Sequence, residues 1–398
     1  MKPIQEFWPT PDLRALSRLT HESEAMPRVP LSSAWRAALF AAFTLLLSSC
    51  GSNSASSNPT GQPGGSASHA YVSNYDTGIG QTLTGYSVAS TNGNLLSFDL
   101  SVIKVPPGPT SVSTDGSGKY LYVGSQGGLI TGYSIDAVSG ALTQSASSPY
   151  GAGRQVNFIT EDSSGKYLFA VDNLSNTVWP FTITAGALNA VASSGTVPSY
   201  GVTPDPPVTA TVDPMLRNLY VAMGAAGTEI FHISGGALLD AGTVPPTSGA
   251  ESQFVAIERT GRFAYVADGV TGVAVYLIDQ TAGNLSLMIA SPVATGSRPI
   301  RIALTPDSKY LYVANQGDGT VSQFALTSGG SLTSIGTNLV AGNQPVAMTV
   351  DPAGLYLYVV NQGSDSVAIF RISAIDGTLT GQAPAGTGPS PSGIVTVP

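Results

Sequence analysis

The side chains of this chain that could do chemistry are scarce, and several of them lie near the start of one strand of a repeated pattern. Only 10% of the 398 residues are Asp, Glu, Lys or Arg. The candidate ligand-binding residues each open or immediately precede an apolar run, and they are Arg154, Asn157, Glu251, Arg298, Arg301 and Gln344. Guanidinium, amide and carboxylate groups that converge can hold an anionic or sugar-like ligand through charge-assisted hydrogen bonds. The residue types therefore predict a binding site wherever the fold brings them together.

Other chemistries lack the residues that they need. The chain has three histidines, which argues against a histidine-rich metal site, and one cysteine, which excludes an intramolecular disulfide. No Gly-x-Ser-x-Gly elbow precedes a helix, so serine-histidine-aspartate catalysis has no support. A net charge of −8 gives no basic footprint for a nucleic acid. We therefore expect no metal, no cofactor and no nucleic-acid partner.

The elements that must position the candidate residues recur along the chain. One copy reads Tyr312-Val313-Ala314-Asn315, followed by a Gly/Asp turn and a second apolar run, which is the pattern of a β-hairpin. The pattern returns at spacings of 45 to 51 residues, with its aromatic residue at Tyr71, Tyr122, Phe169, Tyr220, Tyr265, Tyr312 and Tyr358. Seven copies at this period predict an all-β, seven-bladed β-propeller that forms one domain.

Each repeat contains four apolar runs, which we call strands a to d from the inside of the ring outwards. The first copy, at Tyr71, has no strand a before it, whereas residues 391–397 have the pattern of strand a with no strand b after them. The C-terminal strand is therefore predicted to complete the N-terminal blade and to remove the free sheet edges.

Antiparallel pairing puts the start of strand a beside the end of strand b. The candidate residues should therefore share one mouth of the central channel with the loops between strands b and c. That mouth also receives Asp172, Asp268, Asn315 and Asn361, which we expect to cap their own turns.

The N-terminal part has the features of an export leader. Arg28 and Arg36 precede an apolar run of eleven residues, 37–47, which is too short to span a bilayer as a helix and suits a signal peptide. Leu47-Ser48-Ser49-Cys50 resembles the bacterial lipobox, which implies a lipid on Cys50. We predict a leader over residues 1–49, with Met26 as a possible true start, and a Gly/Ser-rich tether over residues 50–69. The propeller, residues 70–398, would then be exported and anchored to a membrane of the cell envelope.

The repeats resemble the YVTN-type propellers and the related seven-bladed lactonase family, whose named member hydrolyses 6-phosphogluconolactone. The resemblance rests on Tyr312-Val313-Ala314-Asn315, on Tyr358-Val359-Val360-Asn361 and on strand-a runs such as that from Gly108 to Asp115. It covers residues 70–398 and implies the propeller fold. That family often has a histidine two residues after the strand-a proline, where this chain has Ser111 and Arg301.

Two functions remain open at this point. The first is a binding or scaffold propeller that uses the polar mouth of the channel for a carbohydrate, lactone, peptide or protein ligand. The second is the hydrolysis of a sugar lactone, which the resemblance implies, and which requires a base or a metal to generate the attacking hydroxide. A quinoprotein-like propeller is a weaker third reading, because Trp179 is the only tryptophan in the predicted propeller and no tryptophan docking motif repeats.

Overall fold

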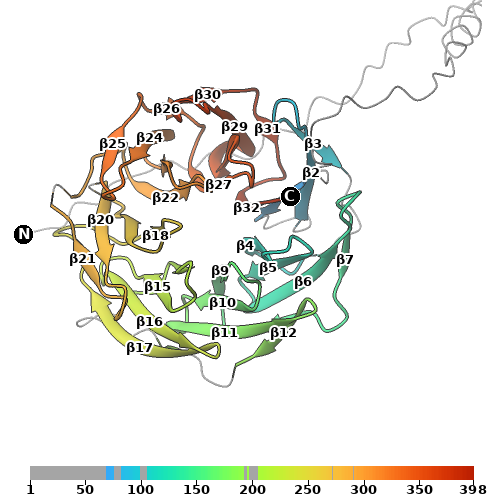
Figure 1. Cartoon of the computed structure of the whole chain (residues 1–398). Helices are drawn as coiled ribbons and strands as arrows, with labels where there is room; N and C mark the ends of the chain where they lie inside the picture. Colours follow the sequence, from blue (N-terminus) through green and yellow to red (C-terminus); the bar gives the residue numbers. More distant parts are fainter. Residues whose placement is uncertain are drawn as a thin grey trace, which may run out of the picture. The chain divides into compact units, whose positions relative to one another are not determined.

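The computed structural model describes residues 69–75, 82–98, 105–191, 195–196, 205–270, 272–289 and 291–398. These residues form seven antiparallel sheets arranged in a ring, as the repeat predicts (Figure 1). The predicted leader, residues 1–49, lies outside the described residues, as do Met26, Cys50 and the tether up to residue 68. The first strand begins at His69, one residue before the predicted boundary.

Each sheet is one blade of four strands, and we number the blades from the one that contains β1. The innermost strands, a, are β32 (Pro391–Val397), β4 (Pro109–Thr114), β9 (Val156–Glu161), β14 (Thr209–Val212), β18 (Phe254–Ile257), β22 (Pro299–Leu304) and β27 (Pro345–Val350). The b strands are β1 (His69–Asn74), β5 (Tyr120–Ser125), β10 (Tyr167–Asp172), β15 (Asn218–Ala222), β19 (Phe263–Ala267), β23 (Tyr310–Asn315) and β28 (Tyr356–Asn361).

The outer half of each blade consists of strands c and d. The c strands are β2 (Thr82–Val88), β6 (Leu129–Ile135), β11 (Thr177–Thr184), β16 (Thr228–Ser234), β20 (Val273–Ile278), β24 (Thr320–Leu326) and β29 (Ser366–Ile372). The d strands are β3 (Leu95–Phe98), β7 (Leu142–Gln144), β12 (Ala187–Ala190), β17 (Ala237–Val244), β21 (Leu285–Leu287), β25 (Leu332–Ser334) and β30 (Leu379–Gly381). Four two-residue strands extend the d side, namely β8 (Tyr150–Gly151), β13 (Gly195–Thr196), β26 (Leu339–Val340) and β31 (Ala385–Gly386). The remaining element is the short 3-10 helix η1 (Gln362–Ser364).

The repeated Tyr-Val strand is the buried centre of every blade. In β23, for example, Leu311, Tyr312, Val313 and Ala314 are all 0% exposed. Successive side chains of a strand point to opposite faces, so one strand b contributes to the packing against both neighbouring blades. Val313 accordingly belongs to the cluster between blades 5 and 6, and Tyr312 to the cluster between blades 6 and 7.

The C-terminal strand completes the first blade, as predicted. β32 pairs with β1 along its length, from His69 opposite Val397 to Asn74 opposite Pro391. The sheet order is β3-β2-β1-β32, so the two ends of the folded chain are hydrogen-bonded to each other. Figure 1 shows the C-terminus inside the ring, beside β32.

The repeat also encodes a hydrogen bond between neighbouring blades. In six blades the strand-b tyrosine hydroxyl donates to the carbonyl of a glycine in the c–d turn of the next blade, at 2.6–3.2 Å. The pairs are Tyr71 with Gly140, Tyr122 with Gly186, Tyr220 with Gly283, Tyr265 with Gly330, Tyr312 with Gly377, and Tyr358 with Gly93. We call this contact the tyrosine clasp. Blade 3 has Phe169 at the same place and therefore has no hydroxyl to donate.

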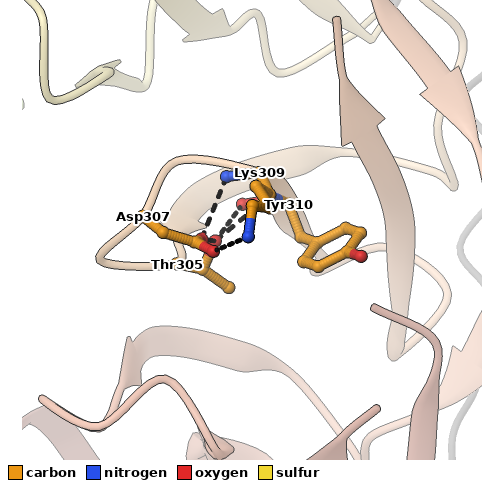
Figure 2. Close-up of polar contacts among 4 residues, drawn as sticks. All are labelled: Thr305, Asp307, Lys309 and Tyr310. Atoms are coloured by element: carbon orange, nitrogen blue, oxygen red, sulfur yellow. Dashed lines mark hydrogen bonds and ion pairs between the residues drawn. The ribbon is translucent and has the colours of Figure 1, made fainter. Parts of the chain in front are cut away.

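The turns between strands a and b are held by capping side chains on the face of the ring opposite the candidate mouth. In most blades a carboxylate accepts the backbone N–H groups of its own turn, as Asp162 does from Lys166 and Tyr167. Blade 6 has Thr305 at this position, and its hydroxyl accepts from the Tyr310 N–H at 3.1 Å and donates to Asp307 (Figure 2). Asp307 also pairs with Lys309 at 3.0 Å, and both side chains are largely exposed, so this ion pair contributes little to stability.

One buried carboxylate lies between blades 3 and 4 and should make stability depend on pH. Glu229 in β16 is 0% exposed, and its register partner Val221 packs in the same cluster as Phe169. The Thr243 hydroxyl donates to Oε2, while Oε1 has no hydrogen-bond partner among the described residues. Burial, more than the nearby Asp240, raises the pKa of Glu229 from 4.5 to about 7.

Substitution Glu229→Gln is expected to stabilise the protein at pH 8 and to have little effect at pH 4. The folded state binds the proton more tightly than the unfolded state, so the stability associated with protonated Glu229 is fully present below pH 4.5. It is lost as the pH rises from 4.5 to 7. The variant should gain about 2 kcal/mol over the parent at pH 8, measured by urea unfolding. Glu251→Gln, at an exposed position, is the control, and equal gains at both pH values would contradict the assignment.

Candidate functional site

The start of strand a and the end of strand b meet at one mouth of the central channel. Pro299 in β22 lies opposite Asn315 in β23, and Pro345 lies opposite Asn361 in the next blade. A register shift of one residue follows each proline, between Pro299 and Arg301 and between Pro345 and Ala347. The start of strand a therefore lies beside the end of strand b in both blades.

Two cavities that share three lining residues lie at this end of the channel. The outer cavity, which we call the mouth pocket, has a volume of about 340 Å³. It is lined by Tyr75, Thr110, Gln126, Asn157, Arg301, Val346, Gln362 and Ser392. The deeper cavity, which we call the inner chamber, has a volume of about 120 Å³. Thr110, Arg301 and Ser392 belong to both linings, so they mark the boundary between the two cavities.

Arg301 is the charged group at that boundary. It extends from β22 so that its guanidinium carbon lies 5.9 Å from the centre of the Phe158 ring and 5.7 Å from that of Phe254. The two rings contact each other edge to face, with centres 6.2 Å apart. Nη1 donates to the carbonyl of Ile300 at 2.9 Å. Arg301 forms no ion pair with a carboxylate among the described residues.

The electrostatic state of Arg301 follows from this environment. Burial lowers the pKa of Arg301 to about 10, so the side chain is still a cation at neutral pH. A charge that is removed from water without a counter-charge is costly, and the two phenylalanine rings offset only part of that cost through cation–π attraction. Arg301 therefore carries a positive charge that no ion pair with a carboxylate among the described residues neutralises.

The six candidate residues of the sequence fall into two groups. Arg301 and Asn157 line the mouth pocket, whereas the exposed side chains of Arg154, Glu251, Arg298 and Gln344 line neither cavity. Asn157 Nδ2 donates to the carbonyl of Val208 at 2.8 Å, which also links blades 3 and 4.

The exposed candidates have local contacts. Glu251 accepts a hydrogen bond from Gln253 Nε2 at 3.2 Å. Arg298 and Gln344 both have positive φ, at 55° and 52°, and their carbonyls accept from the first residue of the neighbouring b–c loop. Arg154 donates through its backbone N–H to Asp172 Oδ2 at 2.6 Å. These four residues therefore surround the mouth without entering it.

Of the four acidic and amide residues at the end of strand b, Asp172 and Asp268 cap their own turns through backbone N–H groups, as predicted, whereas Asn315 and Asn361 bond to other groups. Asp172 accepts the backbone N–H groups of Arg154, Gln155, Leu174 and Ser175, and Asp268 accepts those of Val270 and Gly272. Asn315 donates to Thr320 and Ser322, and Asn361 donates to the Ala341 carbonyl. All four are buried, at 0–2% exposed, so they hold the rim in place and are not available to a ligand.

Sequence reasoning missed several residues that line the site. Tyr75, Gln126 and Gln362 come from b–c loops, and the Tyr75 hydroxyl donates to Gln126 Oε1 at 2.8 Å. A signal existed for the glutamines, because a Gln-Gly pair follows strand b in blades 2, 6 and 7. Phe158 and Met348 had no comparable signal, because an apolar residue on strand a is indistinguishable in sequence from a core residue.

Neither the mouth pocket nor the inner chamber has a His, Cys, Asp or Glu side chain among its lining residues. No cluster of three or more His, Cys, Asp or Glu residues that could hold a metal ion occurs in the described part of the chain. His232 Nδ1 contacts Asn218 Oδ1 at 2.7 Å, in the outer part of blade 4. His69 packs edge to face on Phe98, and burial lowers its pKa despite the nearby Asp136. Neither histidine lines the mouth pocket or the inner chamber.

Within the described ranges, no helix is both long enough and apolar enough to cross a membrane.

Comparison with known proteins places the chain among seven-bladed propellers. Residues 69–396 match the family model described as "Lactonase, 7-bladed beta-propeller". A search of curated protein sequences gave no significant match. Among solved structures, the Pseudomonas aeruginosa periplasmic gluconolactonase is similar with a TM-score of 0.72 and 20% identity, over 84% of this chain and 99% of that one. A Bacteroides fragilis protein, provisionally described as a 6-phosphogluconolactonase, has a TM-score of 0.72 and 19% identity, over 84% and 98% of the two chains.

These two structural likenesses, at 20% identity or less, establish the shared fold. The family match covers the described propeller from its first strand to its last. The chain therefore belongs to the lactonase family of seven-bladed β-propellers.

Proposed function

We propose that this protein is a binding propeller that holds an anionic ligand at the mouth of its central channel, with Arg301 as the principal contact. The observation that carries this proposal is the half-buried Arg301 guanidinium, which lies beside the rings of Phe158 and Phe254 and has no carboxylate partner among the described residues. A carboxylate or phosphate would supply the missing counter-charge and accept the remaining N–H donors of the guanidinium.

The mouth pocket supports the same proposal. Its lining carries the amides of Gln126, Asn157 and Gln362 and the hydroxyl of Tyr75, so a polar ligand finds both donors and acceptors there. The volume of about 340 Å³ lies in the range of small-molecule sites.

Arg301→Gln is expected to weaken the binding of a small anion by about 10- to 100-fold. The reason is that a hydrogen bond to a charged group in a partly desolvated site contributes about 1.5–3 kcal/mol. The measurement is isothermal titration calorimetry of the purified chain with inorganic phosphate and with acetate. Arg298→Gln is the matched control, since Arg298 is an exposed arginine near the same mouth that lines neither cavity. Equal effects of the two substitutions would contradict the proposal.

Hydrolysis of a sugar lactone is the second candidate, and the specific support for it is the two similar structures named as lactonases. Against it stands a mouth pocket without a histidine or carboxylate among its lining residues. Incubation of the purified chain with a panel of sugar lactones separates the two: turnover that Arg301→Gln abolishes favours the hydrolase, and unchanged lactone with retained anion binding favours the binding propeller.

We further propose that the propeller is exported and attached to a membrane of the bacterial cell envelope through a lipid on Cys50. The support is the lipobox-like Leu47-Ser48-Ser49-Cys50 after an apolar run, together with a Gly/Ser-rich tether that ends where β1 begins. Cys50→Ser is expected to abolish incorporation of radiolabelled palmitate and to move the protein from the membrane fraction to the soluble fraction of a bacterial host. Retention of the label in this variant would refute the assignment. Ser57→Thr, in the predicted tether and outside the lipobox-like motif, is the control for the export of the chain.

A further inference from the structure

The inner chamber differs in chemistry from the mouth pocket above it. Seven of its twelve lining residues are apolar, namely Val112, Phe158, Phe254, Ile302, Ala347, Met348 and Ile394. The mouth pocket, in contrast, has one aliphatic residue, Val346, among eight. The lining of the channel therefore becomes more apolar from the mouth pocket to the inner chamber, and Arg301 belongs to both linings.

The hydroxyl groups at the boundary are already engaged with the backbone. Thr110 Oγ1 lies 2.7 Å from the carbonyl of Val156, and Ser392 Oγ lies 2.7 Å from that of Pro109. A hydroxyl has one proton to donate, so neither group can donate to a ligand without losing a contact between blades. Deeper in the chamber, Ser111 Oγ accepts from the backbone N–H of Ile159 at 3.2 Å. Ser111 therefore keeps its own proton, and Arg301 is the charged donor at the chamber entrance.

The size of the chamber limits what can enter it. An engineered apolar cavity of about 150 Å³ binds benzene, and the chamber, at about 120 Å³, is slightly smaller. A polyol in this space would bring several hydroxyls against apolar walls, where they lose hydrogen bonds to water and gain few in return. A hydrocarbon body of roughly five carbons has no hydrogen bonds to water to lose on entry, and it buries its apolar surface.

We infer that the ligand of this site is a compact organic carboxylate, with its apolar body in the inner chamber and its carboxylate on Arg301 at the chamber entrance. This inference rests on the proposed anion-binding function and adds the class of ligand. It places the carboxylate where the guanidinium has unused donors and the hydrocarbon where the walls are Phe158, Phe254 and Met348. A ligand of this kind matches the polarity of each cavity, whereas a polyhydroxylated acid of the same charge matches only the outer one.

The test compares three anions by calorimetry on the purified full chain: cyclopentanecarboxylate, gluconate and inorganic phosphate. We expect cyclopentanecarboxylate to bind at least 10-fold more tightly than gluconate. Met348→Thr should weaken the binding of cyclopentanecarboxylate by about 5-fold and leave the binding of phosphate unchanged. The substitution makes the chamber wall more polar and does not alter Arg301. Met215→Thr, at a position that is 53% exposed, is the matched control.

The outcomes separate this inference from the function on which it rests. The inference is overturned if gluconate binds as tightly as cyclopentanecarboxylate. It is also overturned if Met348→Thr weakens the binding of all three anions equally. In both cases the proposed anion site at Arg301 stands. If none of the three anions binds in a manner that Arg301→Gln abolishes, the proposed function and the inference both fail.

Discussion

Removal of residues 391–398 is expected to lower the melting temperature of the whole propeller in a single transition. The deletion takes away β32, which forms the inner strand of blade 1 and pairs with β1. Ile394 and Val397, at 8% and 3% exposed, pack in the two clusters that flank this blade. Their loss, together with that of partly buried Val395, should cost more than about 5 kcal/mol. Because each blade buries its faces only against its neighbours, the damage is not confined to one end of the chain.

Differential scanning calorimetry of the full and shortened chains measures this effect. Removal of Pro398 alone, which is exposed and follows β32, should leave the transition unchanged and is the control. A shortened chain that melts at the original temperature would show that ring closure contributes no stability. A new minor transition beside an unchanged main one would show that the end frays independently.

Gly377→Ala is expected to destabilise the protein by more than about 3 kcal/mol. Gly377 lies in the c–d turn of blade 7 with φ +75°, and a Cβ atom there would lie 2.1 Å from the ring of Tyr310 in blade 6. The turn cannot move away from the ring easily, because the Gly377 carbonyl accepts a hydrogen bond from the Tyr312 hydroxyl at 2.7 Å. The substitution therefore combines backbone strain with a steric clash at a buried blade interface.

Gly249→Ala separates these two causes. Gly249 has nearly the same conformation, with φ +77°, but no atom lies within 4 Å of the position that a Cβ would take. It should cost only the backbone strain of the left-handed conformation, about 1 kcal/mol. Urea unfolding of both variants gives the comparison, and equal losses would mean that the packing of the glycine against Tyr310 contributes nothing.

The fold was predictable because the same hairpin pattern recurs seven times in the sequence. An aromatic residue and a valine that alternate with small residues, followed by a Gly/Asp/Asn turn, specify a buried strand and its hairpin in each copy. The closing strand was predictable because residues 391–397 have the strand-a pattern without a strand b after them. The tyrosine clasp was not, because the sequence shows the burial of Tyr312 but does not show which carbonyl in the next blade its hydroxyl reaches.

The sequence predicted where the candidate site lies but only some of the residues that line it. Antiparallel pairing placed Arg301 and Asn157 at the mouth, and both line the mouth pocket. The same reasoning also selected Arg298 and Gln344, one residue before the strand-a proline, and their side chains lie outside both cavities. A register shift after the proline decides which side chain enters the channel, and a bulge of this kind depends on local backbone geometry that residue types do not specify.

The tyrosine clasp has a consequence for the symmetry of the ring. Six clasps link blades 4, 5, 6, 7, 1, 2 and 3 in succession, and Phe169 leaves the step from blade 3 to blade 4 without one. The molecule therefore has two seams at different places. The first seam lies in blade 1, where the covalent chain is interrupted. There the two ends of the chain meet as β1 and β32 and are joined by backbone hydrogen bonds. The second seam lies between blades 3 and 4, where the backbone is continuous and the clasp hydrogen bond is missing.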